Sequence, residues 1–279
     1  MNSQLHFISG LPRSGSTLLS GILCQNDRFY ANMSSPVGSL VNGVLEQIGA
    51  GSEFYSFFDE EKRRKMCTSI FDSYYSDQQG REVIFDTNRM WTSKLHQLVE
   101  LYDDFKVICL VRNPAWIMDS FEQIYRKNPF NYSKMFAPGN RHTVYSRCES
   151  MVSGGIVGAA WTALKEAFYG EYSEKLLLVD YELLAMHPDK TMELVYDFIG
   201  EKKYNHDFDN VIFSHDEFDY TIGVKGLHEV KRKVTYKTRR SILPPDLFEK
   251  YSEMTFWKDT AGTAASVIAP KANVIEAIN

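Results

Sequence analysis

Short apolar runs alternate with longer helical patterns along this chain of 279 residues. Segments at residues 16–24, 38–48, 60–75, 92–102, 115–125, 146–169 and 191–199 have the spacing of helices. Between them lie four runs that are typical of buried strands, at Leu5–Ser9, Val83–Phe85, Val107–Val111 and Leu176–Val179. This alternation predicts a single-domain α/β fold with a parallel sheet and helices on both faces. Ligand sites in such folds lie at the carboxyl ends of the strands.

The segment directly after the first strand, residues 10–19, reads Gly-Leu-Pro-Arg-Ser-Gly-Ser-Thr-Leu-Leu. Gly10, Gly15 and Thr17 match the phosphate-binding pattern G-x-x-x-x-G-K-[ST], but Ser16 replaces its lysine and the cation is Arg13. A glycine turn that opens a helix directs backbone N–H groups and the positive helix end at one spot. We therefore expect a phosphate or sulfate site here, with an ordinary strand-to-helix turn capped by serine as the alternative.

The loop resembles the 5′-phosphosulfate loop of sulfotransferases, which use 3′-phosphoadenosine 5′-phosphosulfate (PAPS). The resemblance implies a P-loop-type fold and a role for Arg13 at the transferring sulfonate. It implies that PAPS is bound by Pro12, Arg13, Ser14, Gly15, Ser16, Thr17 and Leu18. The arginine form is most similar to the tyrosylprotein and carbohydrate branches of that family. However, residues 31–37 lack the glutamate that tyrosylprotein sulfotransferases carry in the matching segment.

A second motif strengthens the resemblance. Residues 105–112 read as a strand that ends in Arg112, Asn113-Pro114 starts a helix, and Ser120 follows eight residues after the arginine. This arrangement is similar to the family's 3′-phosphate site, which implies that Arg112 and Ser120 bind that phosphate. The alternative is a strand-end arginine paired with a carboxylate and a serine that faces solvent.

Two weaker segments agree with this interpretation. Tyr181 ends a strand in a Tyr-Glu-x-Leu pattern, so it lies either against the nucleotide or in the core. Residues 226–233 carry a cationic cluster, Lys231, Arg232 and Lys233, where the family places a late basic loop over the nucleotide phosphates. A solvated charged face is the alternative for this cluster.

The general base is harder to identify. Asp86, at a strand end, is our candidate, although capping the next helix or pairing with Arg89 would also explain it. Several relatives carry lysine where this chain has Thr87, so Arg89 is expected to supply the missing cation. Glu46 and His142 are weaker candidates for the base. Arg89, Trp91 and His142 are assigned to the acceptor, and residues 126–145 are interpreted as an insertion that forms an acceptor lid.

Composition limits the remaining possibilities. A net charge of −5 argues against general nucleic-acid binding, and no apolar stretch reaches the roughly 20 residues of a membrane span. The beginning of the sequence has no signal-peptide pattern, and the four scattered cysteines indicate reduced thiols, so we expect a cytoplasmic protein. The His- and Asp-containing residues 204–225 fit no metal-ligand spacing. We expect a sulfotransferase domain at residues 1–260 and a tail at residues 261–279 that packs poorly.

These observations predict an enzyme that moves the sulfonate of PAPS to a hydroxyl or amine, without a metal. The acceptor is a small molecule, a sugar or a protein tyrosine, and the product is 3′-phosphoadenosine 5′-phosphate (PAP). A P-loop kinase that uses Mg-ATP is one alternative, and a non-catalytic nucleotide-binding protein is the other. The sequence makes no prediction of oligomeric state.

Overall fold

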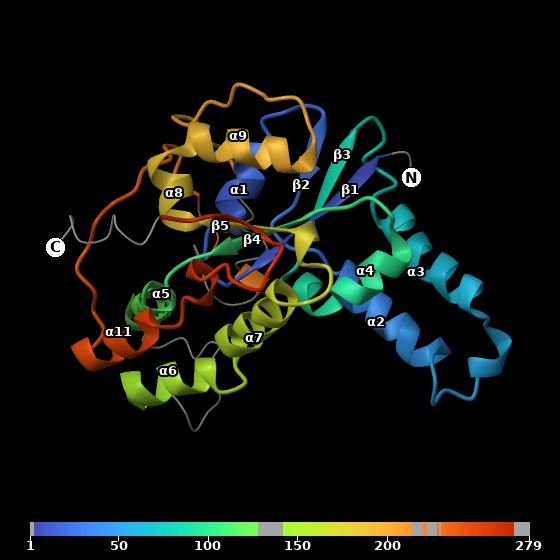
Figure 1. The fold of residues 1–279 in the computed structure, drawn as a ribbon, viewed down its shortest axis with the longest axis horizontal. Helices are drawn as coiled ribbons and strands as arrows, with labels where there is room; N and C mark the ends of the chain where they lie inside the picture. The colour runs from blue at the N-terminus through green and yellow to red at the C-terminus, as the bar shows by residue number, and fades with distance from the viewer. Residues whose placement is uncertain (1–2, 128–141, 214–219, 222–227, 229, 271–279) are drawn as a thin grey trace.

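The computed structural model describes residues 3–127, 142–213, 220–221, 228 and 230–270. Within these residues, one sheet contains six parallel strands in the order β2-β3-β1-β4-β5-β6 (Figure 1). The strands are β1 (Gln4–Gly10), β2 (Phe29–Ala31), β3 (Val83–Thr87), β4 (Val107–Val111), β5 (Leu176–Asp180) and β6 (Ser266–Ile268). The predicted parallel α/β fold is therefore confirmed.

Helices cover both faces of the sheet, because successive strand residues point to opposite sides. Phe7 packs on one face with α2 (Val37–Ile48), α3 (Glu60–Tyr74), α4 (Leu95–Leu101) and α7 (Ile156–Phe168). Its neighbour Ile8 packs on the other face with α1 (Ser16–Leu23), α8 (Tyr181–Met186) and α9 (Pro188–Ile199). Both faces are thus buried, as a parallel sheet requires.

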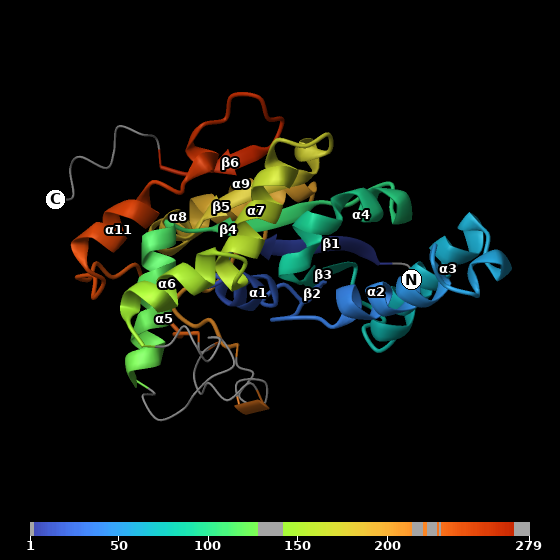
Figure 2. The same cartoon turned by 90° about the horizontal axis from the view of Figure 1, so that it is seen from below.

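The remaining helices lie around this core. α5 (Pro114–Lys127), α6 (Val144–Val152) and α11 (Pro245–Ser252) lie together at one side of the molecule (Figures 1 and 2). The short 3₁₀ helices are η1 (Tyr55–Phe57), η2 (Arg89–Lys94), η4 (Ser173–Lys175) and η5 (Phe256–Lys258). None of the helices in the described ranges is long and apolar enough to span a bilayer.

Three local features differ from the sequence-based expectation. The edge strands β2 and β6, each of three residues, were not expected, and β6 pairs with β5 although its residues belong to the segment interpreted as a tail. The single helix expected over residues 146–169 is two helices, α6 and α7, separated by a turn in which Gly154 has a φ of 77°. The helix expected at residues 92–102 begins as η2 and continues as α4.

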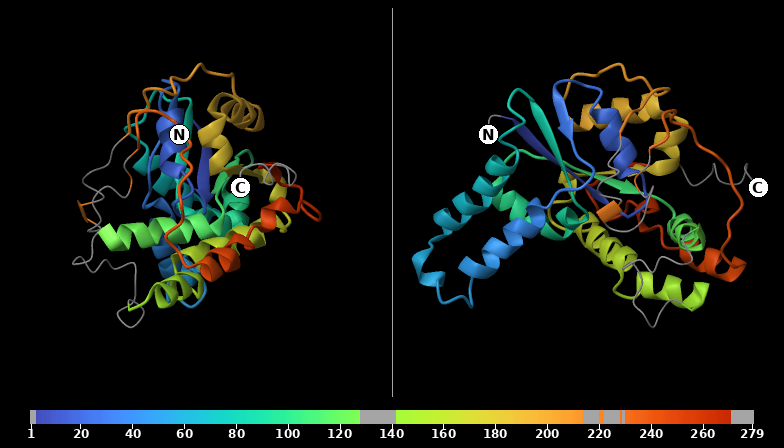
Figure 3. Two further views of the ribbon diagram at one scale, coloured as in Figure 1. Left: turned by 90° about the vertical axis from the view of Figure 1, so that its left-hand side faces the viewer. Right: turned by 180° about the vertical axis from the view of Figure 1, so that it is seen from behind.

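The strand order places β1 between β3 and β4, so the strands on its two sides continue into different loops. Loops that follow these strands therefore diverge at the carboxyl end of β1, which is the topological switch point where such sheets bind ligands. Figure 3 (left) looks onto this end of the sheet, and the orange segment that leads into α11 crosses it.

Candidate functional site

The loop after β1 has a conformation that requires glycine at two points. Gly10 has a φ of 107°, and a Cβ there would lie 2.2 Å from the Leu110 carbonyl oxygen on β4. Gly15 caps α1 with a φ of 97°. None of the backbone N–H groups from Ser14 to Thr17 donates to an acceptor in the described part of the chain, as expected for the first turn of a helix. The loop therefore presents free donors to an anion.

Ser14 and Ser16 have different roles within this loop. The Ser14 hydroxyl is buried and donates to the carbonyl oxygens of Leu11 and Leu110, at 2.9 Å for the latter, so it ties the loop to β4. By contrast, Ser16 and Thr17 line a cavity. The predicted contact of Ser14 with PAPS is thereby reduced to its backbone N–H.

Arg13 connects the loop to α5. It is the one non-glycine residue with a positive φ, 60°, in the described chain, a conformation that costs roughly 1–2 kcal/mol. Its Nε donates to the hydroxyl of Ser120 at 3.2 Å. Backbone strain of this kind gathers at functional sites, and here it directs a cation toward the serine expected to bind the 3′-phosphate.

Arg112, Tyr181 and Gly15, which follow three different strands, are stacked on one another. Its guanidinium lies over the Tyr181 ring, 4.4 Å from the centroid, and its Nε donates to Glu182 at 3.2 Å. The Tyr181 ring in turn lies against Gly15, where a Cβ would approach it to 2.8 Å. Arg112 has the carboxylate partner that the alternative interpretation expects, and it also lines the same cavity as the loop.

The cavity has a volume of about 1390 Å³, more than the roughly 300–1,000 Å³ of a pocket for one drug-sized ligand. Residues 230–239, which we call the strap, form one wall. Seven lysines and arginines of the described chain line the cavity, and none of its described lining residues is Asp or Glu. These cations are Arg13, Arg89, Arg112, Lys231, Lys233, Lys237 and Arg239.

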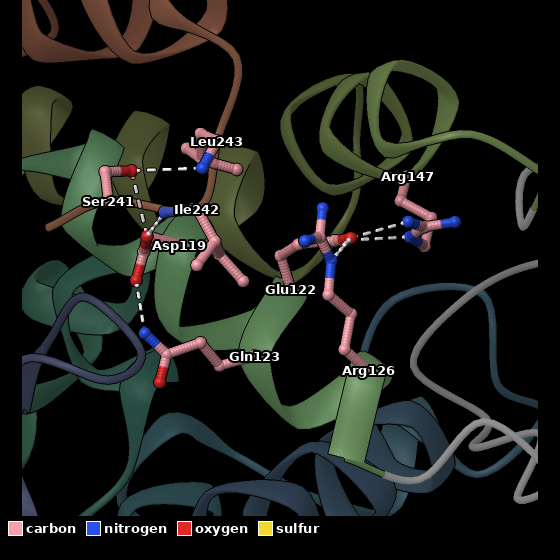
Figure 4. A network of polar contacts seen from close by, with 8 residues as sticks. All are labelled: Asp119, Glu122, Gln123, Arg126, Arg147, Ser241, Ile242 and Leu243. Atoms are coloured by element: carbon pink, nitrogen blue, oxygen red, sulfur yellow. Dashed lines mark hydrogen bonds and ion pairs between the residues drawn. The ribbon is translucent and has the colours of Figure 1, made fainter.

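Asp119 on α5 fixes the C-terminal end of the strap (Figure 4). This fully buried carboxylate accepts from the Ser241 hydroxyl at 2.9 Å, from the Ile242 N–H at 2.7 Å and from Gln123 at 2.8 Å. It also pairs with Arg239, whose guanidinium lies over the Trp116 ring. No sequence pattern indicated this role, because nothing local links residue 119 to residues 239–242.

A second network next to Asp119 joins α5 to α6 (Figure 4). Glu122, 2% exposed, accepts two hydrogen bonds from Arg147, at 2.8 and 2.7 Å, and one from Arg126 at 2.8 Å. This pair fixes the helices on either side of the predicted insertion, most of which lies outside the described residues.

Several predicted site residues lie away from the cavity. Asp86 is fully buried and accepts from Ser35 at 2.6 Å, Tyr75 at 2.6 Å and the Trp91 indole at 2.8 Å. Burial raises the pKa of Asp86, and these hydrogen bonds oppose the shift. Neither the predicted helix cap nor the pairing with Arg89 is found, and this geometry gives no support to Asp86 as a base or to Trp91 as an acceptor contact. His142, Glu46 and Arg232 are exposed and do not line the cavity.

Two residues stand out within the cavity. Arg89, assigned to the acceptor, lines it beside the end of β3. His228 lines it as well, although the sequence placed this residue in the late basic segment without a function. His228 supplies the one imidazole among the described lining residues, and the signal for it was only its position beside the cationic cluster. Residues 226, 227 and 229 of that segment lie outside the described residues.

Comparison with protein-family models identifies one family. A family model described as "Sulfotransferase family" matches residues 6–205, well over half of the chain. A search of curated proteins found no match. Among solved structures, sulfotransferase STF9 from Mycobacterium avium is 9% identical, with 95% of this chain and 79% of that chain covered and a TM-score of 0.52, which supports the fold.

Two further solved structures have lower scores. The sulfotransferase domain of the olefin synthase from Synechococcus PCC 7002 is 19% identical, covers 92% of this chain and 96% of its own, and has a TM-score of 0.49. Mouse sulfotransferase SULT7A1, solved in complex with PAP, is 14% identical, with 92% and 84% covered and a TM-score of 0.47. The family match spans the loop after β1, Arg112, Ser120 and Tyr181, and the chain belongs to the sulfotransferase family.

Proposed function

We propose that this sulfotransferase holds PAPS in the cavity at the carboxyl ends of β1, β4 and β5, and that it transfers the sulfonate to a hydroxyl group. The supporting observation is the cavity lining: the loop at residues 10–18, Arg112 and the strap surround one space whose described lining has seven cations and no carboxylate. Such a lining suits a ligand with several phosphate and sulfate groups.

The residues fit PAPS by their chemistry. The backbone N–H groups of Ser14–Thr17 and the hydroxyls of Ser16 and Thr17 are donors for the 5′-phosphosulfate. Arg112, which lies over the Tyr181 ring, and Ser120, which accepts from Arg13, both line the cavity and are the expected holders of the 3′-phosphate. The strap contributes Lys231 and Lys233 to the lining of the same cavity.

The donor, when bound, supplies an activated sulfonate with a good leaving group. Arg13 and the loop N–H groups are fixed before the reaction, because Ser14 anchors the loop and Ser120 holds the Arg13 side chain. Preorganised donors of this kind stabilise the charge that develops on transferring oxygens, and removing one typically costs roughly 10²–10³ in rate.

The acceptor hydroxyl must lose a proton, and we assign its removal to His228. An imidazole has a pKa near 6.5 and is well suited to accept a proton at neutral pH. The candidates from the sequence, Asp86, Glu46 and His142, do not line the cavity, whereas His228 does.

The kinase alternative needs a carboxylate that holds Mg²⁺ beside the phosphates. Asp86 and Asp180 are the strand-end candidates for that role. Asp86 is occupied by three buried donors, and Asp180 caps α8 by accepting from the N–H groups of Glu182 and Leu183. The arrangement therefore favours sulfonate transfer over phosphoryl transfer from Mg-ATP.

Calorimetric titration with PAP, and with ATP in the presence and absence of Mg²⁺, tests this proposal. We expect micromolar PAP binding without metal. Arg112→Ala should weaken it about 10- to 100-fold, since a hydrogen bond to a charged group contributes roughly 1.5–3 kcal/mol. Arg64→Ala, an exposed arginine on α3, is the matched control. Tighter, Mg²⁺-dependent ATP binding that ignores Arg112 would refute the assignment.

A further inference from the structure

Arg89 lies on the opposite side of the loop from the nucleotide residues. The sheet order β3-β1-β4 places the ends of β3 and β4 on either side of the loop that follows β1. Arg112 follows β4, and Arg89 follows β3 as the first residue of η2. The group to be transferred is expected at the loop itself, so the β3 side is the direction from which an acceptor approaches.

The backbone of Arg89 is fixed, but its charge is not neutralised within the described chain. Its carbonyl oxygen accepts from the hydroxyls of Ser9 at 3.1 Å and Thr92 at 3.4 Å. No described residue forms an ion pair or a hydrogen bond with its guanidinium. Arg89 is exposed and lines the cavity, so its guanidinium is accessible to solvent and to a ligand.

By comparison, three of the six other described cations that line the cavity have carboxylate partners. Arg112 pairs with Glu182, Lys233 with Asp209 and Arg239 with Asp119. A guanidinium that lines a cavity and has no carboxylate partner keeps its charge available to an anionic ligand. Arg89 therefore presents a cation to any anion that binds on the β3 side of the cavity.

The surroundings of Arg89 are neutral. The cavity wall near the ends of β2 and β3 contains Met33, Ser34, Ser39, Asn88 and Met90. The Asn88 side chain is already used, since it donates to the Ser35 carbonyl and accepts from the Met90 N–H. Nothing on this wall would attract an ammonium group, and Arg89 would repel one.

We propose that Arg89 binds an anionic oxygen group of the acceptor, so that the natural acceptor is a hydroxyl compound that also carries a carboxylate, phosphate or sulfate. A planar guanidinium matches these groups in a bidentate manner. This inference rests on the proposed function, because it assumes that PAPS occupies the β4 side of the cavity. If Arg89 has this role, cationic amines are not preferred acceptors, and negatively charged hydroxyl compounds are preferred over uncharged ones.

The experiment compares hydroxy acids with their uncharged counterparts. Hydroxybenzoates, hydroxyphenylacetates and aliphatic hydroxy acids are offered with labelled PAPS, alongside their methyl esters and the matching hydroxy amines; sugar phosphates and sugar sulfates are offered with the free sugars. We expect acids to be sulfated at least tenfold faster than their esters, and Arg89→Gln to remove that difference. Arg89→Lys should retain part of it, and Arg64→Gln should leave it unchanged.

PAP binding is measured first on each variant, so that a failure of the proposed function is distinguished from a failure of the proposed role of Arg89. If the wild type does not bind PAP, the proposed function is wrong. If PAP binds normally, preferential sulfation of esters or amines overturns the role of Arg89. An equal loss with every acceptor in Arg89→Gln also overturns it, since that result places Arg89 at the sulfonate. If no compound is sulfated, calorimetry measures how tightly the PAP-saturated protein binds each acid and its ester. Acids that bind no tighter than their esters overturn the proposal.

Discussion

Substitutions of Asp86 test whether its buried carboxylate has a catalytic or a structural role. Replacing Asp86 by alanine leaves the Tyr75 hydroxyl and the Trp91 indole N–H without an acceptor in the core. The Ser35 hydroxyl, which also accepts from the Val37 N–H, loses its acceptor as well. Each of these three unsatisfied buried donors costs about 1–3 kcal/mol, so we expect a loss of roughly 3–9 kcal/mol of unfolding free energy.

At roughly 2–4 °C per kcal/mol, Asp86→Ala should melt about 6–36 °C below the wild type. Asp86→Asn retains one acceptor oxygen, and a rotated hydroxyl can accept from its amide, so we expect a smaller loss of about 1–3 kcal/mol. Turnover of the folded Asn variant should stay within about threefold of the wild type, whereas loss of a general base costs roughly 10²–10⁴-fold.

The assay pairs thermal unfolding with single-turnover transfer from labelled PAPS, normalised to PAP-binding sites. Asp103→Asn, an exposed aspartate, is the control. Because burial raises the pKa of Asp86, the folded state binds its proton more tightly than the unfolded chain. Its contribution to stability therefore decreases as the pH rises through that raised pKa, and the Asn variant should lose this slope. An Asn variant with unchanged melting and hundredfold slower turnover would refute the reasoning.

Three other predictions concern the strap, the base and the β5 end. Asp119→Asn should weaken PAP binding about tenfold by releasing the strap, whereas Glu122→Gln, in the adjacent network, should lower the melting temperature without changing PAP affinity; calorimetry and thermal unfolding distinguish them. His228→Gln should abolish the acidic limb of the pH–rate profile and slow transfer roughly 10²–10⁴-fold, while PAP binding persists; an unaltered limb would exclude His228 as the base. Burial and the nearby Glu182 carboxylate raise the pKa of Asp180 to about 8. Stability should therefore fall as the pH rises from about 4 to about 8, and Asp180→Asn should flatten that fall in a denaturant series; an unchanged slope would contradict it.

The sequence predicted those parts of the fold that depend on local pattern. Apolar runs predicted β1, β3, β4 and β5, and the glycine loop with Arg112 predicted the edge of the sheet where ligands are expected to bind. The three-residue edge strands β2 and β6 are too short to produce a period, so only their pairing with β3 and β5 reveals them. The Ser-Gly-Gly turn between α6 and α7 carried a turn signal that the helical spacing on both sides outweighed.

Within the candidate site, most of the residues named from the first two motifs line one cavity, whereas Asp86, which was chosen by its chemistry, does not. Arg13, Arg112, Ser120 and Tyr181 surround one cavity. Asp86 was chosen because it is a carboxylate at a strand end, but strand alternation turns it toward the Trp91 side of the sheet, into the core. Which face a strand-end side chain takes depends on register, and the register depends on partner strands far along the chain.

The contact between Gly15, Tyr181 and Arg112 has a consequence for how relatives of this chain vary. A side chain at residue 15 would collide with the Tyr181 ring, and displacing that ring removes the surface on which Arg112 lies. A substitution at Gly15 would therefore also disturb the site that we propose for the 3′-phosphate, although 97 positions separate Gly15 from Arg112. We expect relatives that differ at one of these positions to differ at the other as well.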